Sequence, residues 1–173
     1  AYSFEENIER TKKIVKLAEK YDATVEAELG LVGGSEDGST DQGIRCTNPD
    51  DAGVFCEQTG IDALAVAIGN AHGNYPVAPK LAFDVLEQIH EKTNVPLVLH
   101  GGSGITDDDF QKAISLGIVK INIATASFNR LIMRAEEYFR IPEKHNYFAL
   151  NEAMVKGTYE NVTHHIKVFN CGK

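Results

Sequence analysis

Short apolar runs alternate with amphipathic segments along the chain, which predicts strands that are each followed by a helix. The runs lie at 25–30, 64–68, 96–99 and 119–125, and the two central ones are continuously apolar. Strands of this kind are typical of a parallel sheet that is covered by helices. Apolar residues recur at helical spacing before, between and after the runs. The predicted order is therefore one helix, four strand-helix pairs and a last helix at about 148–169.

Residues that favour helix starts precede the predicted helices. Ser3 followed by Glu6 has the spacing of a capping box ahead of the first helix. Thr47 or Asn48 stands before Pro49, and proline is favoured in the first turn of a helix. These signals support the helix assignments that rest on apolar spacing.

The number of strands points to half of a barrel. A (β/α)8 barrel typically needs about 250 residues and eight strands, whereas this chain has 173 residues. We predict an α/β fold, a (β/α)8 TIM barrel of which this chain supplies the C-terminal half. Residues 1–173 then form a single domain that includes a C-terminal helical extension. Because half a barrel leaves strand edges unpaired, the N-terminal half is expected in another segment or another chain. An open parallel sheet, which needs no second half, is the alternative.

Composition is that of an ordinary globular domain, with 43% hydrophobic and 24% charged residues. The formal net charge of −8 disfavours nucleic acid and anionic membrane surfaces as partners. No apolar run approaches the length of a membrane span, and no signal-peptide pattern opens the chain. The cysteines, Cys46, Cys56 and Cys171, are few and widely spaced, which is typical of reduced thiols in a cytoplasmic protein.

Two histidines follow neighbouring apolar runs, and each stands directly before a glycine: His72 and His100. Neighbouring parallel strands lie about 4.8 Å apart, and barrels carry their active sites at the carboxyl ends of the strands. We therefore predict that both imidazoles converge on one metal ion, with Glu28 of the first strand as a candidate carboxylate ligand. The alternative is that both histidines are hydrogen-bonded structural residues. The remaining histidines are expected on the solvated surface: His90, His145, His164 and His165.

A glycine-rich turn at 101–104 predicts an anion site. Its glycines let backbone N–H groups approach an anion, and Ser103 adds a hydroxyl. The helix that is expected to begin near Thr106 adds a favourable dipole. Asn122 and Thr125 are expected to end the next strand, beside this turn. Barrels often build a phosphate site from their last two strand-end loops, so we predict phosphate binding here; the alternative is a tight connector.

The segment 33–41 is glycine-rich, acidic and without apolar periodicity, which predicts a long mobile loop. It carries Glu36, Asp37 and Asp41. One interpretation is a lid that brings a carboxylate over the site, with the glycines as hinges. The alternative is a solvated surface loop.

These segments resemble the class II, zinc-dependent ketose-bisphosphate aldolases, above all the tagatose-bisphosphate aldolase branch and then the fructose-bisphosphate aldolases. The resemblance is carried by 25–30, 67–73, 97–104 and 120–125, in the same order and spacing. It implies aldol cleavage or condensation of a ketose 1,6-bisphosphate, tagatose or fructose, with dihydroxyacetone phosphate and glyceraldehyde 3-phosphate as products. The chain is then part of a carbon–carbon lyase.

The resemblance also implies roles for individual residues. His72 and His100 are implied to be two of three zinc-binding histidines, and Glu28 to contact a second or displaced metal. Glu36 matches a loop glutamate that moves protons during the carbon–carbon bond chemistry. Besides Zn²⁺, a monovalent cation (Na⁺ or K⁺) is implied near the phosphate. The substrate-binding residues implied are Gly73, Gly101, Gly102, Ser103, Asn122, Ile123, Ala124 and Thr125.

The chain departs from the family pattern in one respect that matters for activity. The third zinc histidine and the catalytic aspartate form an Asp-His pair at an earlier strand end in the family, and this chain contains no such pair. The resemblance assigns both residues to the missing N-terminal half, so this chain alone is expected to be inactive. Ala124 stands where some fructose-type enzymes carry an acid, which favours the tagatose branch.

The expected partners are small-molecule sugar phosphates, the missing N-terminal half of the barrel and further copies of the protein in a homodimer or homotetramer. Nucleic acid and membranes are not expected. Two other functions stay open from the sequence. One is a metal-free phosphate-binding barrel enzyme, such as an isomerase or a synthase. The other is a non-catalytic relative that keeps the sugar-phosphate site.

Overall fold

The core of the protein is a four-stranded parallel sheet with the order β1-β3-β5-β6. A computed structural model describes the chain except for residues 1, 35–42, 44, 76–78, 143–144 and 171–173. The strands of the sheet are β1 (Glu26–Leu29), β3 (Ala63–Val66), β5 (Leu97–Leu99) and β6 (Ile118–Ile121). The predicted α/β fold is confirmed, and the predicted strand and helix order agrees with the structure.

The register of the sheet gives its two faces different characters. Glu28 pairs with Ala65, Ala65 with Val98, and Val98 with Lys120, so these residues form one row across the sheet. Because side chains alternate between faces along a strand, Glu26 shares the face of this row. Residues on the opposite face of the sheet point toward the helices and are fully or almost fully buried: Leu64, Val66, Leu97, Leu99 and Ile118.

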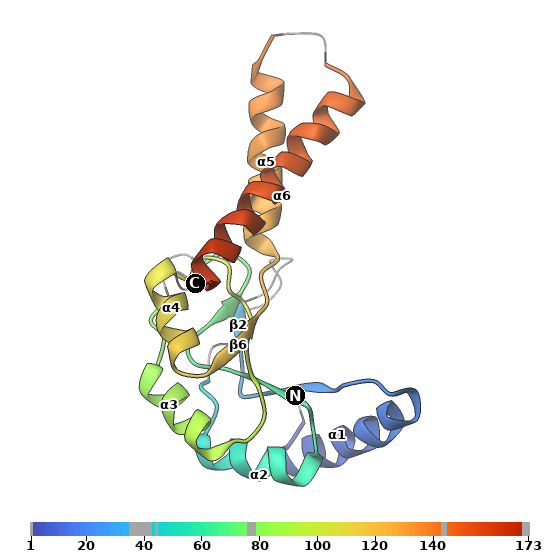
Figure 1. The fold of residues 1–173 in the computed structure, drawn as a ribbon, viewed down its shortest axis with the longest axis vertical. Coiled ribbons are helices and arrows are strands. Elements are labelled where there is room, and N and C mark those ends of the chain that lie inside the picture. Colours follow the sequence, from blue (N-terminus) through green and yellow to red (C-terminus); the bar gives the residue numbers. More distant parts are fainter. Residues whose placement is uncertain (1, 35–42, 44, 76–78, 143–144, 171–173) are drawn as a thin grey trace.

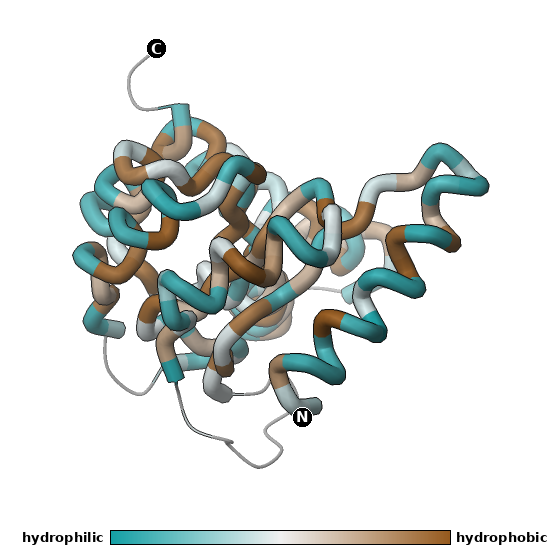
Figure 2. Tube along the Cα trace, turned by 90° about the horizontal axis from the view of Figure 1, so that it is seen from below, coloured by the Kyte–Doolittle hydropathy of each residue, from teal (hydrophilic) through white to brown (hydrophobic). Residues whose placement is uncertain are grey.

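Four helices cover the apolar face of the sheet, and Figure 1 shows them following one another along one side of the strands. The largest buried side chains on these helices are Phe55, Leu86, Ile89 and Phe110. In Figure 2, the helix that begins beside the N label alternates between hydrophilic and hydrophobic stretches, as expected of a helix with one buried face. These helices are α1 (Phe4–Ala18), α2 (Pro49–Thr59), α3 (Phe83–Lys92) and α4 (Asp107–Ser115), with a short 3₁₀ helix η1 (Glu19–Tyr21) after α1.

The predicted caps are present. The side chains of Ser3, Asn48 and Thr106 each accept a hydrogen bond from a backbone N–H group in the first turn that follows, at 2.8–3.2 Å. Asn48, rather than Thr47, is therefore the cap of α2. The buried Thr47 instead connects two strand ends, since its hydroxyl donates to the carbonyl of Leu29 and accepts from the N–H of Ala67.

Two long helices, α5 (Thr125–Arg140) and α6 (Tyr147–Phe169), form a hairpin that extends away from the sheet in Figure 1. Nε of Arg134 on α5 donates to Oε2 of Glu160 on α6 at 3.1 Å. The C-terminal end of α6 returns to α4, where the rings of Phe110 and Phe169 meet edge to face with centroids 5.1 Å apart. None of the helices within the described ranges has a stretch that is both long and apolar enough to cross a membrane.

The structure differs from the sequence prediction in a small second sheet. The segment 33–41 begins with the short strand β2 (Gly33–Gly34), which pairs in parallel with β4 (Ala71–His72). Two residues in each strand are too few to produce any apolar periodicity, so this pairing could not be predicted from the sequence. The rest of the predicted loop, including Glu36, Asp37 and Asp41, lies outside the described residues.

Candidate metal and phosphate site

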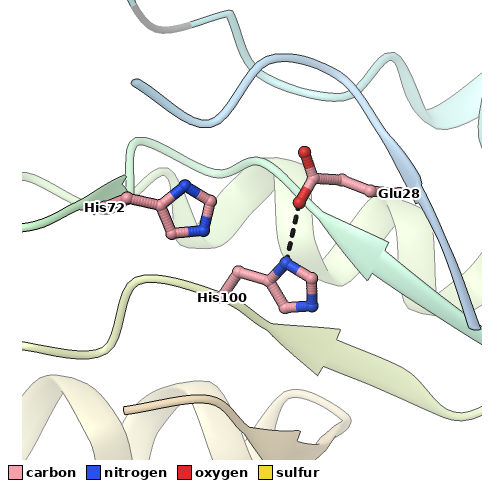
Figure 3. A group of neighbouring side chains, drawn as sticks. All are labelled: Glu28, His72 and His100. Atoms are coloured by element: carbon pink, nitrogen blue, oxygen red, sulfur yellow. Dashed lines mark ion pairs between the residues drawn. The ribbon is translucent and has the colours of Figure 1, made fainter. Parts of the chain in front are cut away.

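Three side chains from three different segments bring potential metal ligands together: Glu28, His72 and His100 (Figure 3). One ligand atom from each residue lies within 4.8 Å of the other two. Nδ1 of His100 is 2.8 Å from Oε2 of Glu28, and the two imidazole centroids are 6.0 Å apart. Two imidazoles and one carboxylate are a donor set that suits zinc, with room for a further ligand. The residues present therefore fit this metal.

The strand that positions His72 at this site was not predicted from the sequence. The prediction placed both histidines at equivalent strand ends, but β3 ends at Val66 and His72 belongs to β4 of the small sheet. The backbone of β4 passes between two glycines. A Cβ atom at Gly34 would lie 2.2 Å from the carbonyl oxygen of His72, and one at Gly101 would lie 2.1 Å from that of Ala71. Only glycine permits this approach, and Gly101 also has a φ of +63°.

His100 lies between two carboxylates. Its Nε2 is 2.8 Å from Oε1 of Glu26, while its Nδ1 faces Glu28. The hydrogen bond with Glu28 raises the pKa of His100, partial burial opposes this, and Glu26 raises it further, so the net shift is upward. For Glu26, partial burial favours a higher pKa, but hydrogen bonds from His100 and Lys120 outweigh it and the net pKa is lowered. Nζ of Lys120 lies 3.0 Å from Oε2 of Glu26.

Neither Glu26 nor Lys120 is among the predicted site residues. A usable signal was present for both. Glu26 and Glu28 are two positions apart on one strand, so period-two alternation places them on the same face. Lys120 stands on an otherwise apolar strand. When an acidic and a basic residue lie on the same face of a parallel sheet, an ion pair between them is expected.

A cavity of about 460 Å³ opens beside the two histidines. Most of the predicted substrate-binding residues line it, but Gly102 does not. Gly102 is buried beneath the turn, where a Cβ would lie 2.7 Å from the side chain of Ile123, and its N–H donates to the carbonyl of Asn122. The lining residues are His72, Gly73, His100, Gly101, Ser103, Ile121, Asn122, Ile123, Ala124 and Thr125.

A helix N-terminus does meet the cavity, but it is not the predicted one. The prediction used the helix after Thr106, whose first turn holds three aspartates and whose residues do not line the cavity. The prediction that Thr125 ends a strand is also wrong, because β6 ends at Ile121 and Thr125 is the first residue of α5. The hydroxyl of Ser103 accepts the N–H of Ala126 at 2.9 Å and thereby fixes the start of α5 beside the cavity. This positive helix end suits an anion.

The other histidines lie away from this site. His90, His145 and His164 are exposed, as predicted, and His164 pairs with Asp107 at 3.0 Å. The prediction of a solvated position is wrong for His165, which is half-buried and meets the ring of Phe110 edge-on with centroids 5.7 Å apart. Its aromatic ring extends the apolar contact between α4 and α6.

Comparison with known proteins agrees with this geometry. The model of the class-II fructose-bisphosphate aldolase family matches residues 1–173, and the chain belongs to that family. It is 43% identical over 167 residues to the D-tagatose-1,6-bisphosphate aldolase subunit GatY of Klebsiella oxytoca. The match covers 93% of this chain and 59% of that relative, so the chain spans about three fifths of the relative's length.

Solved structures show the same fold. The YdjI aldolase from Escherichia coli K12 matches with a TM-score of 0.82 and 40% identity, over 99% of this chain and 58% of that one. A proposed fructose-1,6-biphosphate aldolase from Coccidioides immitis matches with a TM-score of 0.86 and 30% identity, over 99% and 60% of the two chains. The four parallel strands and their helices are therefore part of the TIM-barrel fold of class II aldolases.

Proposed function

We propose that the full-length protein catalyses zinc-dependent aldol cleavage and condensation of a ketose 1,6-bisphosphate. The products of cleavage are dihydroxyacetone phosphate and glyceraldehyde 3-phosphate. The observation that carries the proposal is the convergence of Glu28, His72 and His100 beside a cavity that a helix N-terminus meets. Membership of the class II aldolase family supports it. The 43% identity to a D-tagatose-1,6-bisphosphate aldolase subunit favours tagatose over fructose 1,6-bisphosphate as the substrate.

In this proposal, His72 and His100 hold the zinc ion, and Glu28 is an alternative ligand for it. A zinc ion bound there would polarise the ketone carbonyl of the substrate and stabilise the negative charge that develops on its oxygen. The chain's other residues orient the substrate. Backbone N–H groups of Gly73, Gly101 and Thr125, the first residue of α5, bind the phosphate, and the neighbouring side chains of Asn122 and Thr125 enclose it.

Cleavage also requires proton transfers. When the bond between C3 and C4 breaks, the hydroxyl on C4 loses a proton and C3 gains one. We assign one transfer to Glu36, as the family resemblance implies, although this residue lies outside the described part of the chain. The 173 residues contain no Asp-His pair. The proposal therefore places the third zinc histidine and the main acid-base aspartate outside this chain.

Three further features belong to the same proposal. Residues 1–173 act as a single domain that forms the C-terminal half of the barrel and a helical extension. A monovalent cation, Na⁺ or K⁺, lies near the phosphate. The full-length protein forms a homodimer or homotetramer.

The direct test is a cleavage assay on the full-length protein with D-tagatose and D-fructose 1,6-bisphosphates, before and after chelation. We expect turnover that a chelator abolishes and zinc restores. Full turnover in chelator-treated, metal-free buffer would instead indicate a metal-free barrel enzyme. Binding of dihydroxyacetone phosphate without any turnover would indicate a non-catalytic sugar-phosphate-binding relative.

A further inference from the structure

Two polar side chains outside the ligand set connect the turns that carry the two histidines. The first is Asn70, which is fully buried. Its Oδ1 accepts the N–H of Ile68 at 2.7 Å, and its Nδ2 donates to the carbonyl of His100 at 2.9 Å. The carboxamide therefore joins the end of β3 to the residue that presents the second imidazole.

The second is Tyr75, which lies on the other side of His72 in the sequence. Its hydroxyl accepts the N–H of Ala71 at 2.5 Å and donates to the carbonyl of Gly101 at 2.9 Å. Its ring packs over Gly104, where a Cβ would lie 3.0 Å from the ring. A tyrosine hydroxyl carries its proton at neutral pH and can donate, and burial raises the pKa of Tyr75 further.

These two bridges matter because the strand ladders do not hold the two turns together. β4 pairs with β2, whereas β5 pairs with β3 and β6. Among the hydrogen bonds of the described residues, no backbone–backbone bond joins 70–75 to 100–104. Side-chain bonds from Asn70 and Tyr75 span this gap on both sides of His72. The two turns are therefore connected by these side-chain hydrogen bonds and not by a strand ladder.

We propose that Asn70 and Tyr75 are positioning residues of the metal site, which hold His72 and His100 at the separation that one metal ion requires. This inference rests on the proposed function, because it assumes that the two histidines share a metal. It assigns no catalytic step to either residue. Outer partners that orient metal ligands typically change metal affinity about 10–100-fold when they are removed.

The decisive variant is Tyr75→Phe in the full-length protein, because it removes the hydroxyl and keeps the ring. Tyr138→Phe is a matched control: the hydroxyl of Tyr138 also accepts a backbone N–H and donates to a carbonyl, both of Asn146, but it lies on the helical hairpin. The zinc dissociation constant is measured by competition with a chelator. The visible spectrum of the Co²⁺-loaded protein reports the ligand geometry independently of activity.

We expect Tyr75→Phe to weaken zinc binding about tenfold and to alter the Co²⁺ spectrum, and Asn70→Ala to do so at least as strongly. Tyr138→Phe should match the parent in both measurements. Parental zinc affinity and an unchanged Co²⁺ spectrum in Tyr75→Phe would overturn the inference while leaving the proposed function intact. If Asn70→Ala does not fold, Tyr75→Phe alone decides. A parent protein that binds no zinc would overturn both the inference and the proposed function.

Discussion

Nε2 of His100 lies 2.8 Å from Oε1 of Glu26, although 74 positions separate the two residues in the sequence. This contact occupies one nitrogen of the imidazole. The other nitrogen, Nδ1, faces Glu28 and the ligand cluster. In the proposed site, Glu26 would therefore leave Nδ1 of His100 available to the metal, as carboxylates beside metal-binding histidines commonly do.

Replacing Glu26 should therefore weaken metal binding without removing a ligand. We expect Glu26→Gln to raise the zinc dissociation constant of the full-length protein about 10–100-fold, because the neutral amide holds the imidazole less strongly. Chelator competition measures the change. Glu6→Gln is the control, since the carboxylate of Glu6 pairs with Arg10 on the exposed side of α1. Equal zinc affinity in Glu26→Gln and the parent would contradict this assignment.

Adding a Cβ atom at Gly101 should disturb the site more than adding one at Gly60. Gly60 and Gly101 both have left-handed φ values, +70° and +63°, but a Cβ at Gly60 would meet nothing within 4 Å. We expect Gly60→Ala to lower the free energy of unfolding by roughly 1–2 kcal/mol through backbone strain alone. Gly101→Ala should cost more and also weaken zinc binding, because its Cβ would collide with the carbonyl of Ala71. Urea unfolding and zinc titration measure both effects; equal results for the two variants would refute the expected difference.

The stability of the metal-free protein should depend on pH through His100. Its pKa in the folded protein is raised above 6.5, chiefly by Glu28. A group whose folded pKa is raised contributes stability that is complete below its unfolded pKa and is lost as pH rises through the folded value. We expect the difference in unfolding free energy between the parent and His100→Gln, both chelator-treated, to be largest below about pH 6.5 and to fall above it. A difference that grows with pH would contradict the ion pairs seen here.

The hairpin of α5 and α6 should depend on Phe110 for its attachment. This ring is fully buried and meets Phe169 at the end of α6. We expect Phe110→Ala to cost about 3–5 kcal/mol in the free energy of unfolding, as for other buried phenylalanines. Phe148→Ala is the control, since Phe148 is 82% exposed. Similar losses for both variants, measured by urea unfolding, would show that this contact does not stabilise the fold.

Much of the fold could be predicted from the sequence because its signals are local. Helix caps, apolar spacing and continuous apolar strands each depend on residues within one segment, and the predicted caps at Ser3 and Thr106 are present. The pairing of β2 with β4 could not be predicted, because it depends on close packing between Gly34 and His72, which lie far apart in the sequence. The contact between Glu26 and His100 could not be predicted for the same reason, because 74 positions separate the two residues in the sequence.

Part of the candidate site could also be predicted, because that part depends on a local sequence pattern. His72 and His100 stand next to glycines at the ends of apolar runs, which is a local pattern. The prediction chose the helix after Thr106 because Thr106 is a favourable cap. The helix that meets the cavity is α5, whose first residue, Thr125, was expected to end a strand. The bridging roles of Asn70 and Tyr75 have no local signature at all, since each acts on the backbone of a distant turn.

Zinc content is the measurement that tests the central claim most directly. The full-length protein, its His72→Ala and His100→Ala variants, and His90→Ala as an exposed control are purified and analysed for metal side by side. We predict about one zinc ion per chain in the parent and in His90→Ala. Both site variants should lose the zinc and the ketose-bisphosphate cleavage together. Unchanged zinc content and cleavage in His72→Ala and His100→Ala would show that these imidazoles do not hold the metal.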